Sequence, residues 1–296
     1  MSKIRLSRVS VCGLLLIFFF LYVFLIFWKF QSPFLSPIYT TLSSLPICSH
    51  RATLGIGQTP HTSTELSIYI RKLYTEGITC VDVDIIKVFD GKVIIGHPTL
   101  VNREIGQGQD GPSIDTLFSF LKEFPKATAT LELKGDLRDD IEFAKKLFNE
   151  AKSYSILNQI AVEGQPRDFT NLRTFVALRD RNGPEIGARC GLPLEWKFGN
   201  SLSTDEAIRN VYESIKGADV ILPSSICFEE RVVKEAIELW IIDHKNSKGQ
   251  LIHPWVYDTT ESAISVLKNS KNNRLQDVTK VISNEPILIA KAVRHS

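Results

Sequence analysis

Histidine, carboxylate and basic side chains are grouped in three short segments of the sequence, each at the end of an apolar run. The segments are Ser49-His50-Arg51, Asp82-Val83-Asp84 and Glu132-Leu133-Lys134. A further apolar run at 93–97 ends in a second histidine, His97. The set therefore holds two histidines, three carboxylates, one arginine and one lysine.

These residue types are the ones that cleavage of a phosphodiester requires. Two carboxylates two residues apart on a strand share one face and repel each other unless a positive charge lies between them. A divalent cation that prefers oxygen ligands, Mg²⁺ or Ca²⁺, supplies that charge and neutralises a bound phosphate. Arginine and lysine stabilise the developing charge, while one histidine accepts a proton and the other donates one.

The elements that must position these residues alternate between strand-like and helix-like segments. Two capping boxes, at Thr62–Glu65 and Ser203–Glu206, and the amphipathic stretch 139–152 predict helices. Eight strands in about 250 residues predict an α/β fold, the (β/α)8 TIM barrel, whose active site lies at the carboxyl ends of the strands. The predicted strands are 46–49, 78–84, 128–133, 159–163, 185–190, 218–223, 251–257 and 278–283.

A doubly wound sheet is the alternative fold, but it lacks a phosphate-binding signal after its first strand. The Gly-x-Gly-x-x-Gly match at 106–111 follows a polar segment and precedes Pro112. In that context the pattern predicts a loop.

The N-terminal segment predicts a membrane anchor. Residues 11–28 carry no charge and approach the length that spans a bilayer as a helix. Basic residues precede the segment and only Lys29 follows it closely, which predicts a cytoplasmic tail at 1–10 and a lumenal or extracellular remainder. A proline- and serine-rich stem at 29–46 would lead to a barrel at 47–296. A cleaved signal peptide is the alternative interpretation.

The exported part is close to neutral and holds four of the five cysteines. Residues 1–29 contain four Lys and Arg and no Asp or Glu, so the remainder has 31 basic and 33 acidic residues, a net charge of −2. This balance argues against a nucleic-acid partner, which needs a basic surface. We expect mostly buried thiols, with a disulfide between Cys48 and Cys80 conceivable because both lie in neighbouring predicted strands.

Several motifs together resemble the glycerophosphodiester phosphodiesterase family, within the phospholipase C-like phosphodiesterase barrels. The matching segments are Ser49-His50-Arg51, Asp82-Val83-Asp84-Ile85, Asp90-Gly91, Val93-Ile94-Ile95-Gly96-His97, Glu132-Leu133-Lys134, Pro254-Trp255-Val256 and the closing strand Val281–Pro286. The resemblance is strongest over 48–134. It implies a TIM barrel with His50 and His97 as the acid–base pair. It further implies a divalent metal, Mg²⁺ or Ca²⁺, held by Asp82, Asp84 and Glu132, and a phosphate held by Arg51 and Lys134, with Trp255 as a wall of the substrate pocket.

The sequence also departs from the family pattern. Asp82 stands where the family usually has Glu, Ala52 stands where a Gly usually follows His-Arg, and Pro98 follows His97 in place of Asp. The usual Glu-Asn-Thr after the first strand is replaced at 61–65.

The leading hypothesis is a membrane-anchored, metal-dependent phosphodiester hydrolase that acts on glycerophosphodiesters or related lysophospholipids. A catalytically inactive barrel that serves as a membrane-anchored binding or scaffold protein is the alternative. A type II glycosyltransferase also fits the anchor and stem, but it would leave His50, His97 and Glu132 unexplained.

Overall fold

A computed structural model describes residues 45–88, 91–98, 111–138, 140–164, 183–190, 203–243, 251–272 and 278–295. The chain divides into two compact units, Met1–Ser43 and Ser44–Ser296, and all of the described residues belong to the second unit. No helix among the described residues is long and apolar enough to cross a membrane. The predicted anchor at 11–28, its tail at 1–10 and nearly all of the stem lie outside the described residues.

The described residues form one nine-stranded sheet in the order β8-β7-β6-β5-β4-β2-β1-β9, with β3 paired to β2. Neighbours along this order are parallel, whereas β2 and β3 pair in the antiparallel direction. The strands are β1 (Ile47–His50), β2 (Cys80–Lys87), β3 (Val93–Ile95), β4 (Thr128–Leu133), β5 (Ile160–Gly164), β6 (Glu185–Cys190), β7 (Val220–Pro223), β8 (Leu251–Ile252) and β9 (Val281–Ser283).

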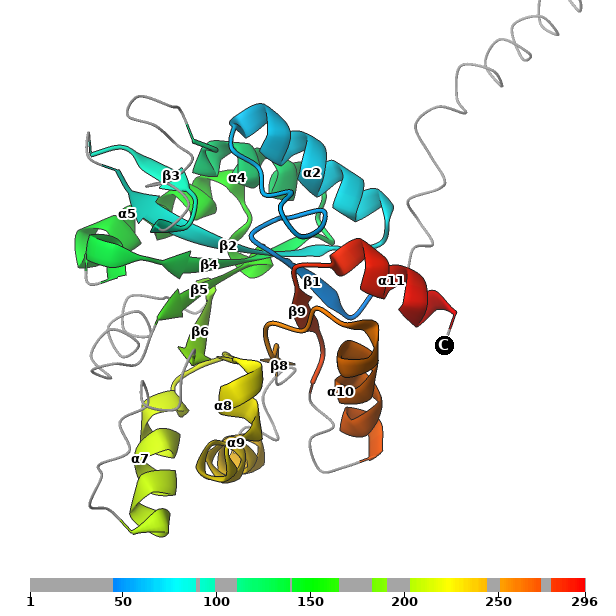
Figure 1. Cartoon of the computed structure of the whole chain (residues 1–296). Helices are drawn as coiled ribbons and strands as arrows, with labels where there is room; N and C mark the ends of the chain where they lie inside the picture. The colour runs from blue at the N-terminus through cyan, green and yellow to red at the C-terminus, as the bar shows by residue number, and fades with distance from the viewer. Residues whose placement is uncertain are drawn as a thin grey trace, which may run out of the picture. The chain divides into compact units, whose positions relative to one another are not determined.

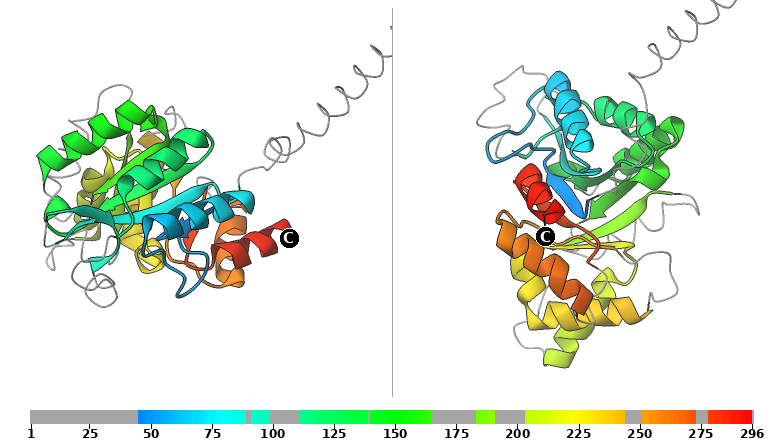
Figure 2. Two further views of the ribbon diagram at one scale, coloured as in Figure 1. Left: turned by 90° about the horizontal axis from the view of Figure 1, so that it is seen from above. Right: turned by 90° about the vertical axis from the view of Figure 1, so that its right-hand side faces the viewer.

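Helices follow the strands along the chain and pack around the outside of the sheet (Figures 1 and 2). Both predicted capping boxes are present, since Thr62 and Ser203 each accept from the backbone N–H of a glutamate three residues on. The α-helices are α2 (Ser63–Thr75), α4 (Ile114–Glu123), α5 (Ile141–Tyr154), α7 (Thr204–Ile215), α8 (Ser225–Glu229), α9 (Arg231–Asp243), α10 (Thr260–Asn272) and α11 (Pro286–Arg294), with 3₁₀ turns η2 (Gly135–Arg138) and η3 (Leu157–Gln159).

The two ends of the strand order are joined by backbone contacts between β8 and the segment that leads into β9. Thr279 N–H donates to the carbonyl of Ile252 at 3.2 Å, and Ile282 N–H donates to the carbonyl of Pro254 at 2.9 Å. The strand predicted at 251–257 is cut to two residues, because Pro254 has no N–H to continue a regular ladder. The result is a TIM-like α/β fold of parallel strands with helices outside, as the alternation predicts.

Residues along a strand alternate between the face that packs against the helices and the inner face of the curved sheet. In β2, Val81, Val83 and Ile85 join the large apolar core formed with the helices. Cys80, on the other face of β2, belongs to a small second cluster with residues of β1, β5, β7 and β9. The period of two places Asp82 and Asp84 on the same inner face as Cys80.

Four of the cysteines form two disulfides, so the expectation of mostly buried thiols is wrong for them. The conceivable pair Cys48–Cys80 is present, because the parallel register sets these residues opposite each other on β1 and β2. The second disulfide, Cys190–Cys227, joins the end of β6 to α8. Cys12 lies outside the described residues, as do residues 106–110 of the glycine pattern.

Candidate active site

The strand register brings the predicted site residues together at one end of the sheet. His50, the last residue of β1, lies opposite Asp82 of β2, and Asp84 lies opposite Glu132 of β4. His50, Asp82, Asp84 and Glu132 are all buried, with exposed fractions of 6% or less. Sequence reasoning therefore identified one cluster and not scattered surface residues.

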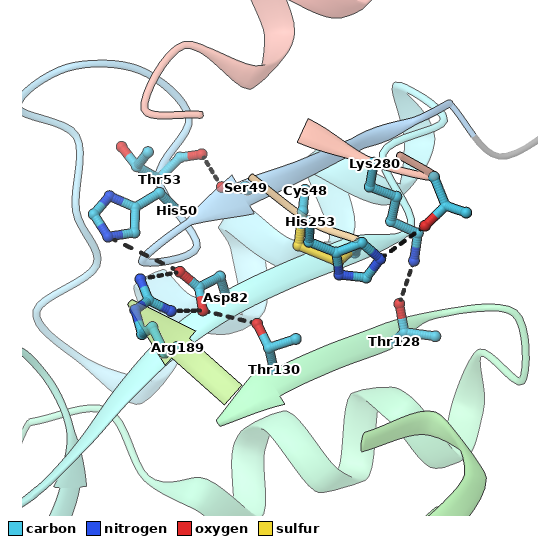
Figure 3. Close-up of a disulfide and its surroundings, with 12 residues drawn as sticks. Cys48, Ser49, His50, Thr53, Asp82, Thr128, Thr130, Arg189, His253 and Lys280 are labelled. Atoms are coloured by element: carbon cyan, nitrogen blue, oxygen red, sulfur yellow. Dashed lines mark hydrogen bonds and ion pairs between the residues drawn. A yellow bond between two sulfur atoms is a disulfide. The ribbon is translucent and has the colours of Figure 1, made fainter. Parts of the chain in front are cut away.

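Arg189 of β6 lies at the centre of these carboxylates. Its guanidinium contacts both oxygens of Asp82, at 3.1 and 3.3 Å, and reaches Oε2 of Glu132 at 2.8 Å and Oε2 of Glu163 at 2.6 Å. Figure 3 shows Arg189 beside Asp82 and His50. Burial alone would lower the pKa of Arg189, but the surrounding carboxylates outweigh burial and raise this pKa well above its usual value. A permanent cation therefore lies where the carboxylates meet.

The same guanidinium acts to lower the pKa of the carboxyl groups that it contacts. Burial alone would raise the pKa of Asp82, but Arg189 and His50 outweigh burial and lower this pKa to about 2. Thr130 Oγ1 also donates to Asp82 at 2.7 Å. Burial raises the pKa of Glu163, although its contact with Arg189 acts in the opposite direction.

Sequence reasoning missed Arg189 and Glu163, although a signal was present. The strand-end rule was applied to the first three strand units, while the predicted strands 159–163 and 185–190 also carry these charged residues near their carboxyl ends. The register places Glu163 of β5 opposite Glu132 of β4, and β6, which carries Arg189, is the next strand in the sheet.

Arg51 and Lys134 lie against the outer carboxylate of the pair on β2. Arg51 Nε is 3.2 Å from Asp84 Oδ2, and Lys134 Nζ is 3.3 Å from Asp84 Oδ1 and also pairs with Glu132. The side chain of Arg51 is 29% exposed and that of Lys134 is 15% exposed, so these cations face the open side of the cluster. They are placed where an anionic ligand can reach them.

The backbone after β1 takes an unusual conformation that directs Arg51. Arg51 and Ala52 have φ values of 56° and 52°, in the left-handed region that favours glycine. Thr53 N–H donates to the carbonyl of His50, and Ser49 Oγ donates to the carbonyl of Thr53. This tight turn keeps His50 and Arg51 at the same strand end.

The ring of His50 is oriented through two residues near the other end of the chain. His50 Nδ1 lies 2.7 Å from Asn284 Oδ1, while Asn284 Nδ2 donates to Asp258 at 3.1 Å. Because the amide nitrogen of Asn284 donates to Asp258, its oxygen accepts a hydrogen bond from Nδ1–H of His50. Burial lowers the pKa of His50 despite nearby Asp82, so the ring is neutral and its Nε2 carries the lone pair.

The second predicted histidine, His97, follows the β3 hairpin. Gly96 N–H donates to the carbonyl of Asp84 at 2.9 Å, which holds this segment beside β2. Burial lowers the pKa of His97 to about 4, and the charges of Asp84, Arg51, Lys134 and His50 also act on it. His97 is therefore within electrostatic reach of the same cluster and is neutral at pH 7.

Trp255 lies over the centre of the site. Its ring is 4.2 Å from the guanidinium of Arg189 and 6.2 Å from the ring of His50, and its Nε1 donates to the carbonyl of Leu222. Stacking of a guanidinium on an indole is a favourable cation–π contact. The structure thus brings Trp255 to the cluster, where it covers the central cation.

The predicted metal ligands do not fit a divalent ion in this arrangement. Asp82 and Glu132 contact Arg189, and Asp84 contacts Arg51 and Lys134. No group of three or more His, Cys, Asp or Glu in the described part of the chain could hold a metal ion. In this arrangement basic side chains supply the positive charge that the carboxylates require, and the metal at Asp82, Asp84 and Glu132 stays a prediction.

Comparisons with known proteins show the fold. The chain matches a phosphodiesterase described as putative from Galdieria sulphuraria with a TM-score of 0.55 and 14% identity over 85% of this chain and 98% of that one. It matches a glycerophosphoryl diester phosphodiesterase, also described as putative, from Silicibacter pomeroyi with a TM-score of 0.54 and 12% identity, over 84% of this chain and 95% of that one. A glycerophosphodiester phosphodiesterase from Thermotoga maritima matches with a TM-score of 0.50 and 17% identity, over 84% of this chain and 98% of that one.

No family model matches the chain, and no curated protein sequence matches it. The chain therefore has the fold of solved glycerophosphodiester phosphodiesterases at low sequence identity. This agrees with the fold that the motif resemblance implies.

Proposed function

We propose that this protein is a phosphodiester hydrolase that acts on glycerophosphodiesters or related lysophospholipids. The observation that carries the proposal is the presence of two neutral histidines, His50 and His97, beside two partly exposed cations, Arg51 and Lys134, at one end of the sheet. The fold shared with solved phosphodiesterases supports the same reaction class.

In the proposed reaction, a substrate hydroxyl next to the phosphate attacks phosphorus. One histidine takes the hydroxyl proton, the bond from phosphorus to the leaving oxygen breaks, and the other histidine gives that oxygen a proton. The products are a cyclic phosphate and an alcohol. Water then attacks the cyclic phosphate with the reverse proton transfers, which opens the ring and restores both histidines.

The geometry supports separate roles for the two histidines. The hydrogen bond to Asn284 fixes His50 as a ring with a free lone pair on Nε2, which suits a base. A bound phosphate is an anion and raises the pKa of a neighbouring histidine, which suits His97 as the acid. Arg51 and Lys134 would hold the phosphate, and Trp255 would wall the pocket.

The test is turnover by the full chain, purified in a mild detergent, with glycerophosphodiesters and lysophospholipids as substrates. We expect His50→Gln and His97→Gln each to lower turnover by about 10²- to 10⁴-fold, the usual contribution of one acid or base. His295→Gln, at an exposed position on the last turn of the chain, is the matched control and should leave turnover unchanged. Absence of turnover by the unaltered chain would favour the non-catalytic barrel instead.

We further propose that the barrel faces the lumen or the cell exterior on a single N-terminal anchor at 11–28. Two disulfides in the described residues support this location, because disulfides persist in oxidising compartments.

A further inference from the structure

We propose that Arg189 takes the place of a divalent cation in this site, so that the protein binds no Mg²⁺ or Ca²⁺ there and functions without one. This inference rests on the proposed phosphodiesterase function where turnover is measured. The calorimetric measurement of metal binding does not depend on that function.

The guanidinium of Arg189 occupies the space between the carboxylates. Arg189 directs its guanidinium at carboxylates from three strands, Asp82 of β2, Glu132 of β4 and Glu163 of β5, with contacts of 2.6 to 3.3 Å. A divalent ion bound by the same carboxylates would sit about 2.0–2.6 Å from their oxygens. The guanidinium fills that space, and the two cations exclude each other.

Arg189 is enclosed by its surroundings. Its side chain is 2% exposed, and it is among the largest fully buried side chains in the described residues. Trp255 covers one face of the guanidinium, and the Cys190–Cys227 disulfide fixes the adjacent residue to α8. A buried arginine this enclosed does not swing out to admit an ion.

The three carboxylates predicted to bind a metal already have cationic partners. Asp82, Asp84 and Glu132 are in direct ion pairs with Arg189, Arg51 and Lys134. A divalent ion would add two positive charges to carboxylates that are already paired. The attraction that draws a metal into a carboxylate cluster is therefore missing.

The first experiment uses the full chain, stripped with EDTA and exchanged into metal-free buffer. We expect an unchanged thermal unfolding midpoint, unchanged turnover, and no binding heat when Mg²⁺ or Ca²⁺ is titrated calorimetrically. Stoichiometric binding of either ion that Asp82→Asn abolishes would overturn the inference, as would a loss of turnover that either ion restores.

The second experiment removes the built-in cation. Arg189→Ala should lower the unfolding midpoint by on the order of 10 °C, because it leaves buried carboxylates without their partner. Methylguanidinium at millimolar concentration should raise the unfolding midpoint of the Arg189→Ala variant more than the same concentration of sodium chloride does. Arg71→Ala, which removes an exposed ion pair with Glu123, is the control and should show neither effect.

The outcomes separate this inference from the proposed function. A stripped wild-type chain that neither binds metal nor turns over any substrate supports the cation replacement and contradicts the hydrolase. A chain that turns over substrate only with added metal supports the hydrolase and contradicts the replacement. If Arg189→Ala does not fold, the wild-type titration still decides.

Discussion

At the residue scale, specific polar partners orient the histidine of the candidate site. Asn284 can orient His50 because its own amide nitrogen is bound to Asp258. His253 is a contrasting case, since it is buried near the Cys48–Cys80 disulfide, away from Arg189, with Nε2 3.1 Å from Thr279 Oγ1 (Figure 3). Burial and the nearby charge of Lys280 lower the pKa of His253 to about 3. This histidine stays neutral in the folded state well below the pH at which a free histidine is protonated.

His253 should therefore make stability sensitive to mild acid. Below pH 6.5 His253 binds a proton in the unfolded chain but not in the folded chain. The free energy of unfolding therefore falls as the pH decreases from 6.5 toward 3. The loss is about 1.4 kcal/mol per pH unit once the unfolded histidine is protonated. Urea unfolding at pH 7, 6 and 5 should show a smaller decline for His253→Gln than for the unaltered chain. His295→Gln should decline like the unaltered chain, and equal declines for all three would contradict the assignment.

At the element scale, the turn between β1 and α2 and the attachment of β6 matter most for the site. Arg51 and Ala52 take left-handed backbone conformations that cost a side-chain-bearing residue roughly 1–2 kcal/mol each. The turn persists because Ala52 is fully buried and Thr53 bonds back to His50. Burial and hydrogen bonding thus maintain a strained turn that places Arg51 beside Asp84.

Replacing Ala52 by Gly should separate backbone strain from packing. Glycine relieves the left-handed conformation but loses one buried methyl group, worth about 0.8 kcal/mol, so the free energy of unfolding should change by less than about 1 kcal/mol. Ala144→Gly, at an equally buried position inside α5, loses the methyl and also weakens the helix. It should cost at least about 1 kcal/mol more than Ala52→Gly in chemical denaturation. Equal costs would argue against strain at Ala52.

The disulfide at the end of β6 should contribute measurably to stability. Cys190 and Cys227 are 37 residues apart, and closing a loop of that length stabilises a fold by about 3–4 kcal/mol. The double variant Cys190→Ala, Cys227→Ala should lose about that amount in urea unfolding. Peptide mapping without reductant should find the pair in the unaltered chain, and free thiols at both positions would contradict the prediction.

The sequence predicts elements better than it predicts partners. Alternating apolar runs locate all eight parallel strands, because the period of two and the capping boxes are local signals. Contacts between distant residues carry no such signal. Arg189 in the middle of the carboxylates and the link from Cys190 to Cys227 both depend on which strand lies next to which. The motif resemblance predicted residues that the register brings together, but it gave no signal that Arg189 contacts two of the predicted metal ligands.

At the scale of the whole molecule, the described fold is one TIM-like unit that follows an N-terminal segment with a long uncharged run. The proposed anchor predicts that the chain sediments with membranes and resists extraction by alkaline carbonate. Added protease should spare the barrel in sealed vesicles and digest it after detergent treatment, since the barrel would lie inside. A chain with 11–28 deleted is the control and should not sediment. Extraction of the unaltered chain by carbonate would contradict the anchor.

The arginine on β6 also changes how the site depends on its surroundings. A bound ion stabilises a protein by mass action, so occupancy rises and falls with the free concentration of the ion. A cationic side chain of the protein itself has no such dependence, because every folded molecule contains it. Asp82 and Glu132 are therefore neutralised at the same moment that β6 joins β5, and the site is complete in any compartment, whatever its supply of metal.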